Sequence, residues 1–140
     1  METSKIIYCA DVIAIASSSP SRYVIIERLG EKGGFALPGG KQEPNEILSE
    51  TARRELLEET GLWFESTHVL GTYAEPDRDP RGQYISTVFI GTAEGVRRGE
   101  KGKTRAHLLD REEILKREKD FVFDHFAMLA DYFKKHCHYY

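Results

Sequence analysis

Acidic side chains gather in one short stretch of the chain, between Gly40 and Leu62. If the stretch is helical, Glu55, Glu58 and Glu59 fall within a sector of roughly 100° on one helical face. Like charges that share a half-buried face repel each other unless cations offset them. Grouped carboxylates suit divalent metal ions, which bind them together with the phosphates of a ligand. The stretch therefore predicts a metal site that can hold a phosphate chain.

An acidic helix can also be a solvated surface with ion pairs four residues apart, and Glu50, Arg54 and Glu58 have that spacing. We favour metal binding because Leu48 and Ala52 point into or beside the acidic sector, which indicates that the three acids are not solvated. Mg²⁺ is the expected ion, since it prefers hard oxygen ligands and no His or Cys lies within the stretch. Mn²⁺ is kept as a substitute.

The residues around the acidic stretch predict the limits of its helix. Asn45 is a suitable N-cap, and Glu46 then lies at the positive end of the helix dipole. Gly61 tolerates the left-handed conformation with which a chain leaves a helix. Before the helix, Gly39 and Gly40 follow a proline. Their backbone can approach a ligand closely and deliver carbonyls or amides to a metal and its phosphates.

The stretch is identified as a Nudix box. The family pattern has a glycine, five residues, a glutamate, seven residues and then Arg-Glu-apolar-any-Glu-Glu-any-Gly-apolar, and this chain fills every fixed position. A pattern with this many constrained positions is far more specific than a lone glycine-rich loop. In the family the preceding loop reads Trp-any-Leu-Pro-Gly-Gly, and here Phe35 replaces the tryptophan.

The resemblance to Nudix hydrolases implies a role for each charged residue of the box. Arg54 would pair with and orient a glutamate, while Glu46 would close the loop electrostatically or act as an outer ligand. The implied catalytic residues are Glu46, Arg54, Glu55, Glu58 and Glu59. The implied metal ligands are Gly40, through its carbonyl, Glu55, Glu58 and Glu59. The implied reaction is hydrolysis of the pyrophosphate bond of a nucleoside diphosphate derivative.

Two segments outside the box resemble small ADP-ribose pyrophosphatases. Residues 77–82, Asp-Arg-Asp-Pro-Arg-Gly, are similar to an Arg-Asp-Pro-Arg stretch of that group, and residues 123–125, Phe-Asp-His, are similar to a motif near its C-terminal helix. We predict that Arg78, Arg81 and Gly39 contact the substrate. The structural alternatives are a salt-bridged turn around Pro80 and a helix start capped by Asp124.

The chain departs from the family at the residue that activates water. Relatives commonly carry a glutamate in a run resembling Glu-Ala-Arg-Trp, whereas Arg105 begins the matching run here. An arginine cannot be a base at neutral pH. Either Glu100, Glu112 or Glu113 takes the role, or a box glutamate does, or activity is low. We favour a box glutamate or a metal-bound hydroxide, because metal coordination lowers the pKa of water.

The favoured function is that of a Mg²⁺-dependent ADP-ribose pyrophosphatase that yields AMP and ribose 5-phosphate. One alternative is hydrolysis of oxidised nucleoside triphosphates or dinucleoside polyphosphates on the same fold. A different class is a sensor that binds ADP-ribose without turnover. The intact box disfavours the sensor, while the missing loop glutamate favours it.

The surrounding elements predict an α/β fold, which the resemblance specifies as a Nudix-like α/β/α sandwich with a mixed β-sheet. Apolar and β-branched runs predict strands over residues 11–16, 23–29, 68–74 and 84–92. Helices are expected over 110–116 and 121–135, the second with a core stripe of Phe126, Leu129 and Phe133. The loop 75–82 should border the site. The basic run 97–105 is interpreted as a solvated loop, with a lid over an anionic ligand as the alternative.

The whole composition is that of one domain, predicted over residues 1–140. The net charge of −3 provides no basic field for nucleic acid, and the apolar residues 6–16 are too few to span a membrane. Two cysteines and no recognisable signal peptide predict a cytoplasmic protein. His136, Cys137 and His138 are interpreted as a terminal tail rather than a metal site. A homodimer is expected by analogy only.

Overall fold

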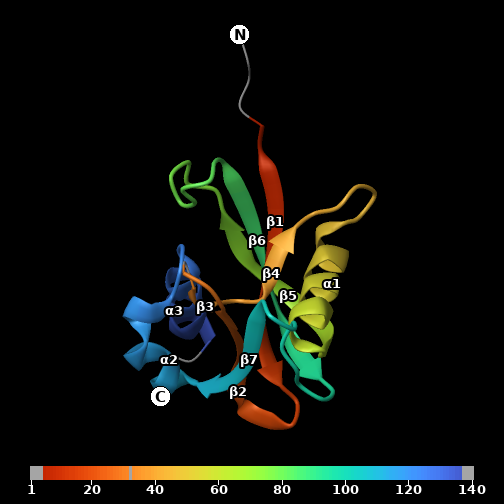
Figure 1. The fold of residues 1–140 in the computed structure, drawn as a ribbon, viewed down its shortest axis with the longest axis vertical. Coiled ribbons are helices and arrows are strands. Elements are labelled where there is room, and N and C mark those ends of the chain that lie inside the picture. Colours follow the sequence, from red (N-terminus) through yellow and green to blue (C-terminus); the bar gives the residue numbers. More distant parts are fainter. Residues whose placement is uncertain (1–4, 32, 137–140) are drawn as a thin grey trace.

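The computed structural model describes residues 5–31 and 33–136. Its strands are β1 (Ile7–Ala16), β2 (Ser19–Arg28), β3 (Gly34–Ala36), β4 (Gly39–Lys41), β5 (Trp63–Tyr73), β6 (Tyr84–Glu94) and β7 (Thr104–Asp110). Its helices are α1 (Leu48–Thr60), α2 (Arg111–Lys116) and α3 (His125–His136), with a 3-10 turn at Glu118–Asp120. The strands form one mixed sheet in the order β3-β2-β1-β6-β5, with β4 paired to β1 and β7 to β2. The helix α1 lies on one side of the sheet, and α2 and α3 lie on the other (Figure 1).

The alternation of side chains along β1 explains the two layers of helices. Val12 and Ala14 belong to a core cluster that includes Leu56 of α1. Ile13 points to the opposite face and joins a larger cluster that includes Leu129 of α3. Successive residues of a strand face opposite sides of a sheet, so a strand buried on both sides is apolar at most positions. The predicted α/β/α arrangement with a mixed sheet is confirmed.

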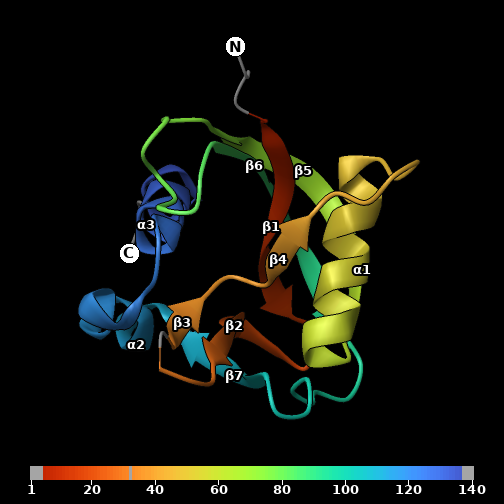
Figure 2. The ribbon, with the colours of Figure 1, turned by 45° about the horizontal axis from the view of Figure 1, so that its top comes forward.

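The sheet divides into two arms next to the turn that joins β1 to β2. The strands β1 and β2 pair at Ile15 and Ala16, with a register shift between these residues. Towards its beginning β1 pairs with β4 instead, while β2 pairs with β3 and β7. Residues 37–38 cross from β3 on one arm to β4 on the other (Figure 2). This crossing places the glycine-containing segment before α1 between the two arms.

The predicted start of α1 is wrong. The helix begins at Leu48, and the Glu50 carboxylate accepts a 3.0 Å hydrogen bond from the backbone N–H of Ile47, the N-cap residue. Asn45 does not cap the helix, because it has a φ of 65° and forms part of a turn. Asparagine is one of the few residues other than glycine that adopt this conformation readily. The predicted end is confirmed, since Gly61 has a φ of 74° at the C-cap.

Other element predictions are confirmed with shifted boundaries. The strand β5 begins at Trp63 rather than at residue 68, and α2 begins at Arg111 with Asp110 as its N-cap. The helix α3 begins at His125 rather than at residue 121. The residue before Asp124 explains the delay, because Phe123 has a φ of 54°, which is incompatible with a right-handed helix.

The strand β7 and the short strands β3 and β4 were not predicted. Along its whole length β7 pairs with β2, so the end of the basic run 97–105 is strand rather than loop. Polar residues mask the pattern, because Arg105 is exposed and His107 forms a 3.0 Å contact with Glu27 on the neighbouring strand.

The interior of the second layer agrees with the prediction. Leu129 and Phe133 are buried, and Phe126 packs against the same cluster. At the end of α3, the Nε2 atom of His136 lies 3.0 Å from that of His68 at the surface. Cys137 and His138 lie outside the described residues. Within the described part of the chain, no helix is both long and apolar enough to cross a membrane.

Candidate active site

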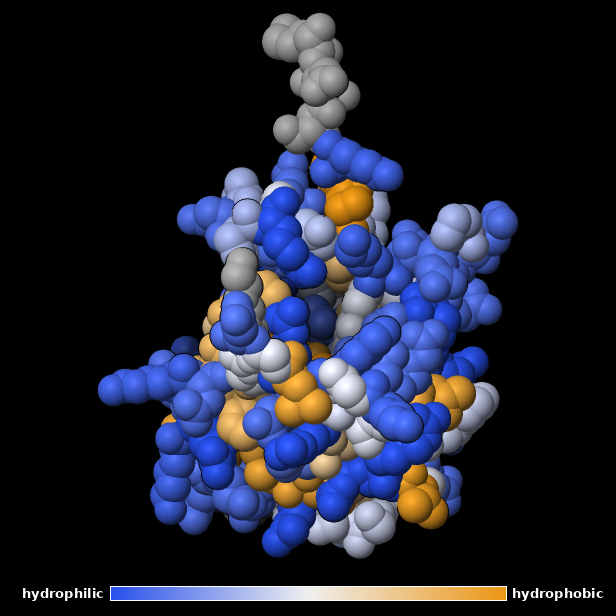
Figure 3. All heavy atoms as spheres, in the orientation of Figure 1, coloured by the Kyte–Doolittle hydropathy of each residue, from blue (hydrophilic) through white to orange (hydrophobic). Residues whose placement is uncertain are grey.

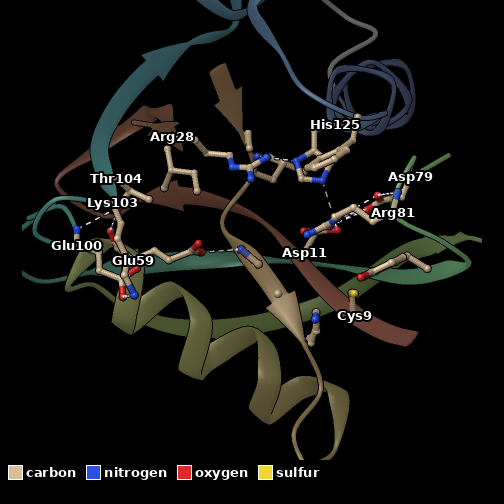
Figure 4. Close-up of a pocket in the computed structure, with 18 of the residues that line it drawn as sticks. Cys9, Asp11, Arg28, Glu59, Asp79, Arg81, Glu100, Lys103, Thr104 and His125 are labelled. Carbon is tan, nitrogen blue, oxygen red and sulfur yellow. Dashed lines mark hydrogen bonds and ion pairs between the residues drawn. The ribbon is translucent and has the colours of Figure 1, made fainter. Parts of the chain in front are cut away.

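A cavity of about 510 Å³ lies where the two arms of the sheet diverge. Its volume is in the range of small-molecule sites, roughly 300–1,000 Å³. The corresponding face is hollowed near its middle and bordered mainly by hydrophilic residues (Figure 3). The lining includes Cys9, Asp11, Arg28, Leu37, Gly39, Gly40, Glu59, Arg78, Asp79, Arg81, Tyr84, Glu100, Phe123 and His125. In the close-up, Glu59 and Glu100 lie on one side, and Asp79 and Arg81 on the other (Figure 4). We call these sides the carboxylate end and the arginine end.

Arg54 organises the acidic side chains of α1 and of the turn before it. Its guanidinium donates from Nε to Glu46 Oε2 at 2.7 Å and from Nη2 to Glu46 Oε1 at 3.0 Å. It also donates from Nη1 to Glu55 Oε1 at 2.5 Å and lies 3.4 Å from Glu58 Oε1. The Arg54 hydrogen bonds lower the pKa of Glu46 to about 2 and, with the attraction of Glu55, raise the pKa of Arg54. The fork geometry of arginine suits this two-point contact.

Glu59 is the box residue that faces the cavity most directly. It stands in the last turn of α1, and its Oε1 accepts a 2.8 Å hydrogen bond from Gly39 N. Burial raises its pKa to about 9, the Gly39 hydrogen bond opposes the shift, and the charges of Glu55, Asp11 and Glu100 add to it. Glu59 is therefore protonated at neutral pH, because burial and the neighbouring negative charges both disfavour its ionised form.

Glu55 shows the same effect more weakly. Burial raises its pKa, the bond to Arg54 opposes the shift, and the nearby Glu58 and Glu100 add to it. A Cβ on Gly40 would overlap the Glu55 carboxylate, so only glycine allows this backbone to approach so closely. The donors are all oxygens and their negative charge is not fully offset, which fits a hard divalent cation.

The three predicted metal ligands do not share one orientation. Among the residues that the structure describes, no three His, Cys, Asp or Glu side chains converge on one point. Glu55 and Glu58 face Arg54, whereas Glu59 faces Gly39. The expectation that all three acids are shielded from solvent is wrong for Glu58, whose side chain is 49% exposed.

Glu100 reaches the carboxylate end from the loop before β7. Its backbone N–H donates to Thr104 Oγ1 at 3.0 Å, and that hydroxyl donates to the Glu59 carbonyl at 3.3 Å. The loop is thus attached to the end of α1, with Glu100 beside Glu59 (Figure 4). Arg105 lies on β7 with an exposed side chain. Neither Glu112 nor Glu113 is among the described residues that line the cavity.

At the arginine end, each of two arginines has its own carboxylate. Arg78 donates to both oxygens of Asp124, at 2.8 and 2.7 Å, and to the Tyr84 carbonyl at 3.1 Å. Its side chain is only 6% exposed. Burial lowers the pKa of Arg78, but the pairing with Asp124 more than offsets this and the pKa is raised. These contacts use most of its donors, so Arg78 supports the loop 75–82 while it also lines the cavity.

Arg81 has a different setting. It pairs with the buried Asp79 at 2.7 Å, but its side chain is 52% exposed. The bonds from Arg81 lower the pKa of Asp79, and Asp79 in turn raises that of Arg81. The guanidinium lies 4.6 Å from the ring centroid of Tyr84 and 5.1 Å from that of Phe123. The salt-bridged turn predicted as an alternative is therefore present, and it presents Arg81 to the cavity.

Some lining residues were missed by the sequence interpretation. Arg28, at the end of β2, lies 5.3 Å from the Phe123 ring centroid. Asp11 is buried on β1 and accepts a 2.5 Å hydrogen bond from Ser86 Oγ. The signal for Asp11 was available, because a charge inside an apolar strand is rarely buried without a partner. Arg28 has no local signal, since a charged residue at a strand end is common.

Comparison with known proteins identifies the family. Residues 8–132 match the family model of the NUDIX domain. The chain therefore belongs to the Nudix family, whose hydrolases generally need divalent metal ions. The resemblance inferred from the box is confirmed.

Individual relatives add detail. An ADP-ribose pyrophosphatase of Methanocaldococcus jannaschii is 42% identical over 105 residues, which cover 74% of this chain but only 59% of that protein. A putative 8-oxo-dGTP diphosphatase of Bacillus subtilis is 31% identical over 118 residues, covering 76% of this chain and 73% of that protein. The NUDIX domain of Shewanella oneidensis NrtR, solved in complex with ADP ribose, has a TM-score of 0.81 at 17% identity and covers 95% of this chain and 90% of that one. At that identity the likeness supports the fold alone.

Proposed function

We propose that this chain is a Mg²⁺-dependent pyrophosphohydrolase that splits ADP-ribose into AMP and ribose 5-phosphate. The observation that carries the proposal is one cavity with excess carboxylates at one end and arginines with aromatic rings at the other. ADP-ribose fits this arrangement, because its pyrophosphate can bind a cation held by the carboxylates while the arginines and rings contact the rest of the molecule. The Methanocaldococcus jannaschii relative, which is 42% identical, is named an ADP-ribose pyrophosphatase.

The residues proposed to hold Mg²⁺ are Gly40, Glu55, Glu58 and Glu59. The ion would supply charge neutralisation on the phosphate oxygens. Arg54 stabilises the Glu46 turn beside the helix and keeps Glu55 in place. The backbone N–H of Gly39 already donates to Glu59. Gly39 is therefore proposed to contact the substrate through the close approach of its backbone and not through this N–H. Mn²⁺ is the proposed substitute.

We assign water activation to Glu100 in place of a box glutamate. Its side chain is 35% exposed and lines the cavity beside Glu59, where it can accept a proton from a water that attacks phosphorus. A glutamate from this loop takes the place that Arg105 cannot fill. Arg81 and Arg28 are proposed to bind the phosphate or ribose groups, with Phe123 and Tyr84 beside them.

A second candidate is hydrolysis of oxidised nucleoside triphosphates, because a relative at 31% identity is named a putative 8-oxo-dGTP diphosphatase. The cavity volume of about 510 Å³ is in the usual range for small-molecule sites and does not by itself exclude either nucleotide. The non-catalytic sensor is disfavoured, since every charged position of the box is filled.

Other expectations stay predictions from the sequence. These are a single domain over residues 1–140, a cytoplasmic location, a homodimer, and the absence of nucleic-acid partners. The net charge of −3 supports the last of them.

The deciding experiment measures AMP release from ADP-ribose with and without Mg²⁺, beside 8-oxo-dGTP, a diadenosine polyphosphate and a nucleotide sugar. The proposal expects Mg²⁺-dependent AMP from ADP-ribose at the highest kcat/KM of the panel. The Glu59→Gln variant is the control, because activity from contaminating phosphatases would remain in this variant. Preference for 8-oxo-dGTP would replace the substrate, and ADP-ribose binding without turnover of any substrate would favour the sensor.

A further inference from the structure

His125, at the start of α3, contacts the segment before the metal site rather than open solvent. It is 6% exposed, and its Nδ1 accepts a 3.0 Å hydrogen bond from Leu37 N. A backbone N–H can only donate, so Nδ1 carries no proton and a neutral ring carries it on Nε2. Nε2 lies 3.6 Å from Asp11 Oδ2, and the two side chains face each other in the cavity wall (Figure 4).

Two buried contacts thus fix the segment 37–39. His125 holds the amide of Leu37, and the Pro38 carbonyl accepts a 2.9 Å hydrogen bond from Val12 N. Next in sequence, Gly39 packs so closely over Asp11 that a Cβ would overlap Oδ1. The Gly39 amide then binds Glu59. A displacement of Leu37 would therefore move the group that orients the Glu59 carboxylate.

Asp124, the residue before His125, contacts the arginine end of the cavity. Asp124 binds Arg78 through both oxygens, and Arg78 in turn holds the Tyr84 carbonyl. These bonds fix the loop 75–82, which carries Arg81. The backbone before Asp124 is itself held, because Val122 N donates to the Phe35 carbonyl at 2.9 Å.

Consecutive residues therefore support two different walls. Phe123 adopts a left-handed φ of 54°, a conformation that a bulky side chain accepts only where its surroundings impose it. The turn lets Asp124 reach the loop 75–82 while His125 reaches Leu37. We propose that Asp124 and His125 are positioning residues, with Asp124 setting the arginine end and His125 setting the carboxylate end of the active site.

The test separates the two ends by direct binding. Mn²⁺ binding is followed by electron paramagnetic resonance without nucleotide, and ADP-ribose binding is followed by calorimetry without metal. His125→Leu should weaken Mn²⁺ binding about tenfold, the lower range for residues that orient metal ligands, and should lower kcat with little change in KM. Asp124→Asn should weaken ADP-ribose binding about tenfold and raise KM, with Mn²⁺ binding unchanged.

A conservative variant excludes a general packing effect. In His125→Asn the amide oxygen can take the place of Nδ1 as acceptor, so Mn²⁺ binding should return to within about threefold of the parent. The matched controls are His107→Asn, at a histidine paired with Glu27, and Asp131→Asn, at an α3 aspartate bonded to Tyr73. Both should leave the two binding constants unchanged.

Several outcomes would overturn the inference. These are unchanged Mn²⁺ binding in His125→Leu, equal losses in His125→Leu and His125→Asn, or the same pattern of loss in Asp124→Asn and His125→Leu. The kinetic part rests on the proposed function, whereas the Mn²⁺ part does not. If the parent hydrolyses another nucleotide but the Mn²⁺ pattern holds, the substrate is wrong and the positioning role of His125 stands.

Discussion

The two ends of the cavity balance charge in opposite ways. At the carboxylate end, Arg54 lies within 4 Å of carboxylate oxygens of four glutamates, Glu43, Glu46, Glu55 and Glu58. Among the described contacts Glu59 has no arginine of its own, and Glu100 has only the exposed Lys103, whose Nζ lies 3.6 Å away. At the arginine end, each arginine is matched by one aspartate in two-point contact. One end therefore holds excess negative charge, and the other is close to neutral.

One end therefore destabilises the folded chain, whereas the other makes it rigid. Crowded carboxylates raise one another's pKa and destabilise the folded chain unless a cation or a proton offsets them. Paired guanidinium and carboxylate groups hold geometry, and breaking such a buried pair is costly. The carboxylate end should thus respond strongly to ions and pH, and the arginine end should respond mainly to substrate.

The largest effect should follow removal of one charge at the carboxylate end. Glu59→Gln keeps an oxygen for Gly39 N but loses a proposed metal ligand. We expect kcat to fall about 10³-fold, a loss of roughly 4 kcal/mol in transition-state stabilisation. Steady-state kinetics at saturating Mg²⁺ measures it. A fall smaller than about tenfold would mean that Glu59 does not belong to the reacting centre, and the carboxylate end would lose its proposed role.

The same variant should be more stable when no metal is present. The folded pKa of Glu59 is about 9 against an ordinary 4.5, so between these values the folded state holds a proton that the unfolded state has lost. Stability therefore falls as pH rises through this window, by at most about 1.4 kcal/mol per pH unit. Thermal melting in EDTA should show a steeper decline from pH 5 to pH 8 in the parent than in Glu59→Gln. Parallel curves would contradict the raised pKa.

The next largest effect should follow loss of the proposed base. We expect Glu100→Gln to lower kcat about 10²-fold, as for typical general-base variants. Arg105→Glu is the matched control, since its side chain points away on β7 and a glutamate there should change kcat less than twofold. Recovery of activity by Arg105→Glu in the Glu100→Gln background would show that a carboxylate at position 105 reaches the attacking water, which would contradict the placement of this side chain away from the cavity.

Replacement of the shared arginine should mainly affect stability. Arg54→Gln leaves Glu46 and Glu55 without their guanidinium, and we expect a loss of about 2 kcal/mol, reduced from the 3–5 of a fully buried pair by exposure. The Glu46 pKa of about 2 lies below its ordinary 4.5, so this stabilisation is present above pH 4.5 and lost as pH falls towards 2. The difference in urea unfolding between the two proteins should therefore shrink steadily from pH 5 to pH 2. A constant difference would place the stabilisation outside the Glu46 pair.

Much of the carboxylate end could be predicted because its contacts are local in sequence. Glu55, Glu58 and Glu59 share one helix, and the end of that helix at Gly61 follows from backbone conformation alone. The start failed for a tertiary reason. Arg54 holds Glu46 in a turn, and this pairing outweighs the capping preference of Asn45.

The arginine end could not be assembled from the sequence. Arg78 meets Asp124 across 46 positions, and His125 meets Leu37 across 88. No local pattern encodes which distant carboxylate will pair with which arginine. The sequence therefore predicted a substrate contact for Arg78 but not its burial against Asp124. Strand β7 was missed for a similar reason, since its pairing with β2 overrides a polar composition.

The smallest effect should follow replacement of Arg81 or Arg78, and it should separate the roles of these two arginines. Arg81→Gln should raise KM for ADP-ribose about tenfold, or roughly 1.4 kcal/mol, with little change in stability because the side chain is 52% exposed. Arg78→Gln should lower stability and affect KM only through the loop, because its guanidinium is bonded to Asp124 and Tyr84. Calorimetric binding and melting of the same two variants would separate the roles. If Arg78→Gln lost more affinity than stability, the buried arginine would be the substrate contact after all, and the arginine end would be an open site rather than a rigid support.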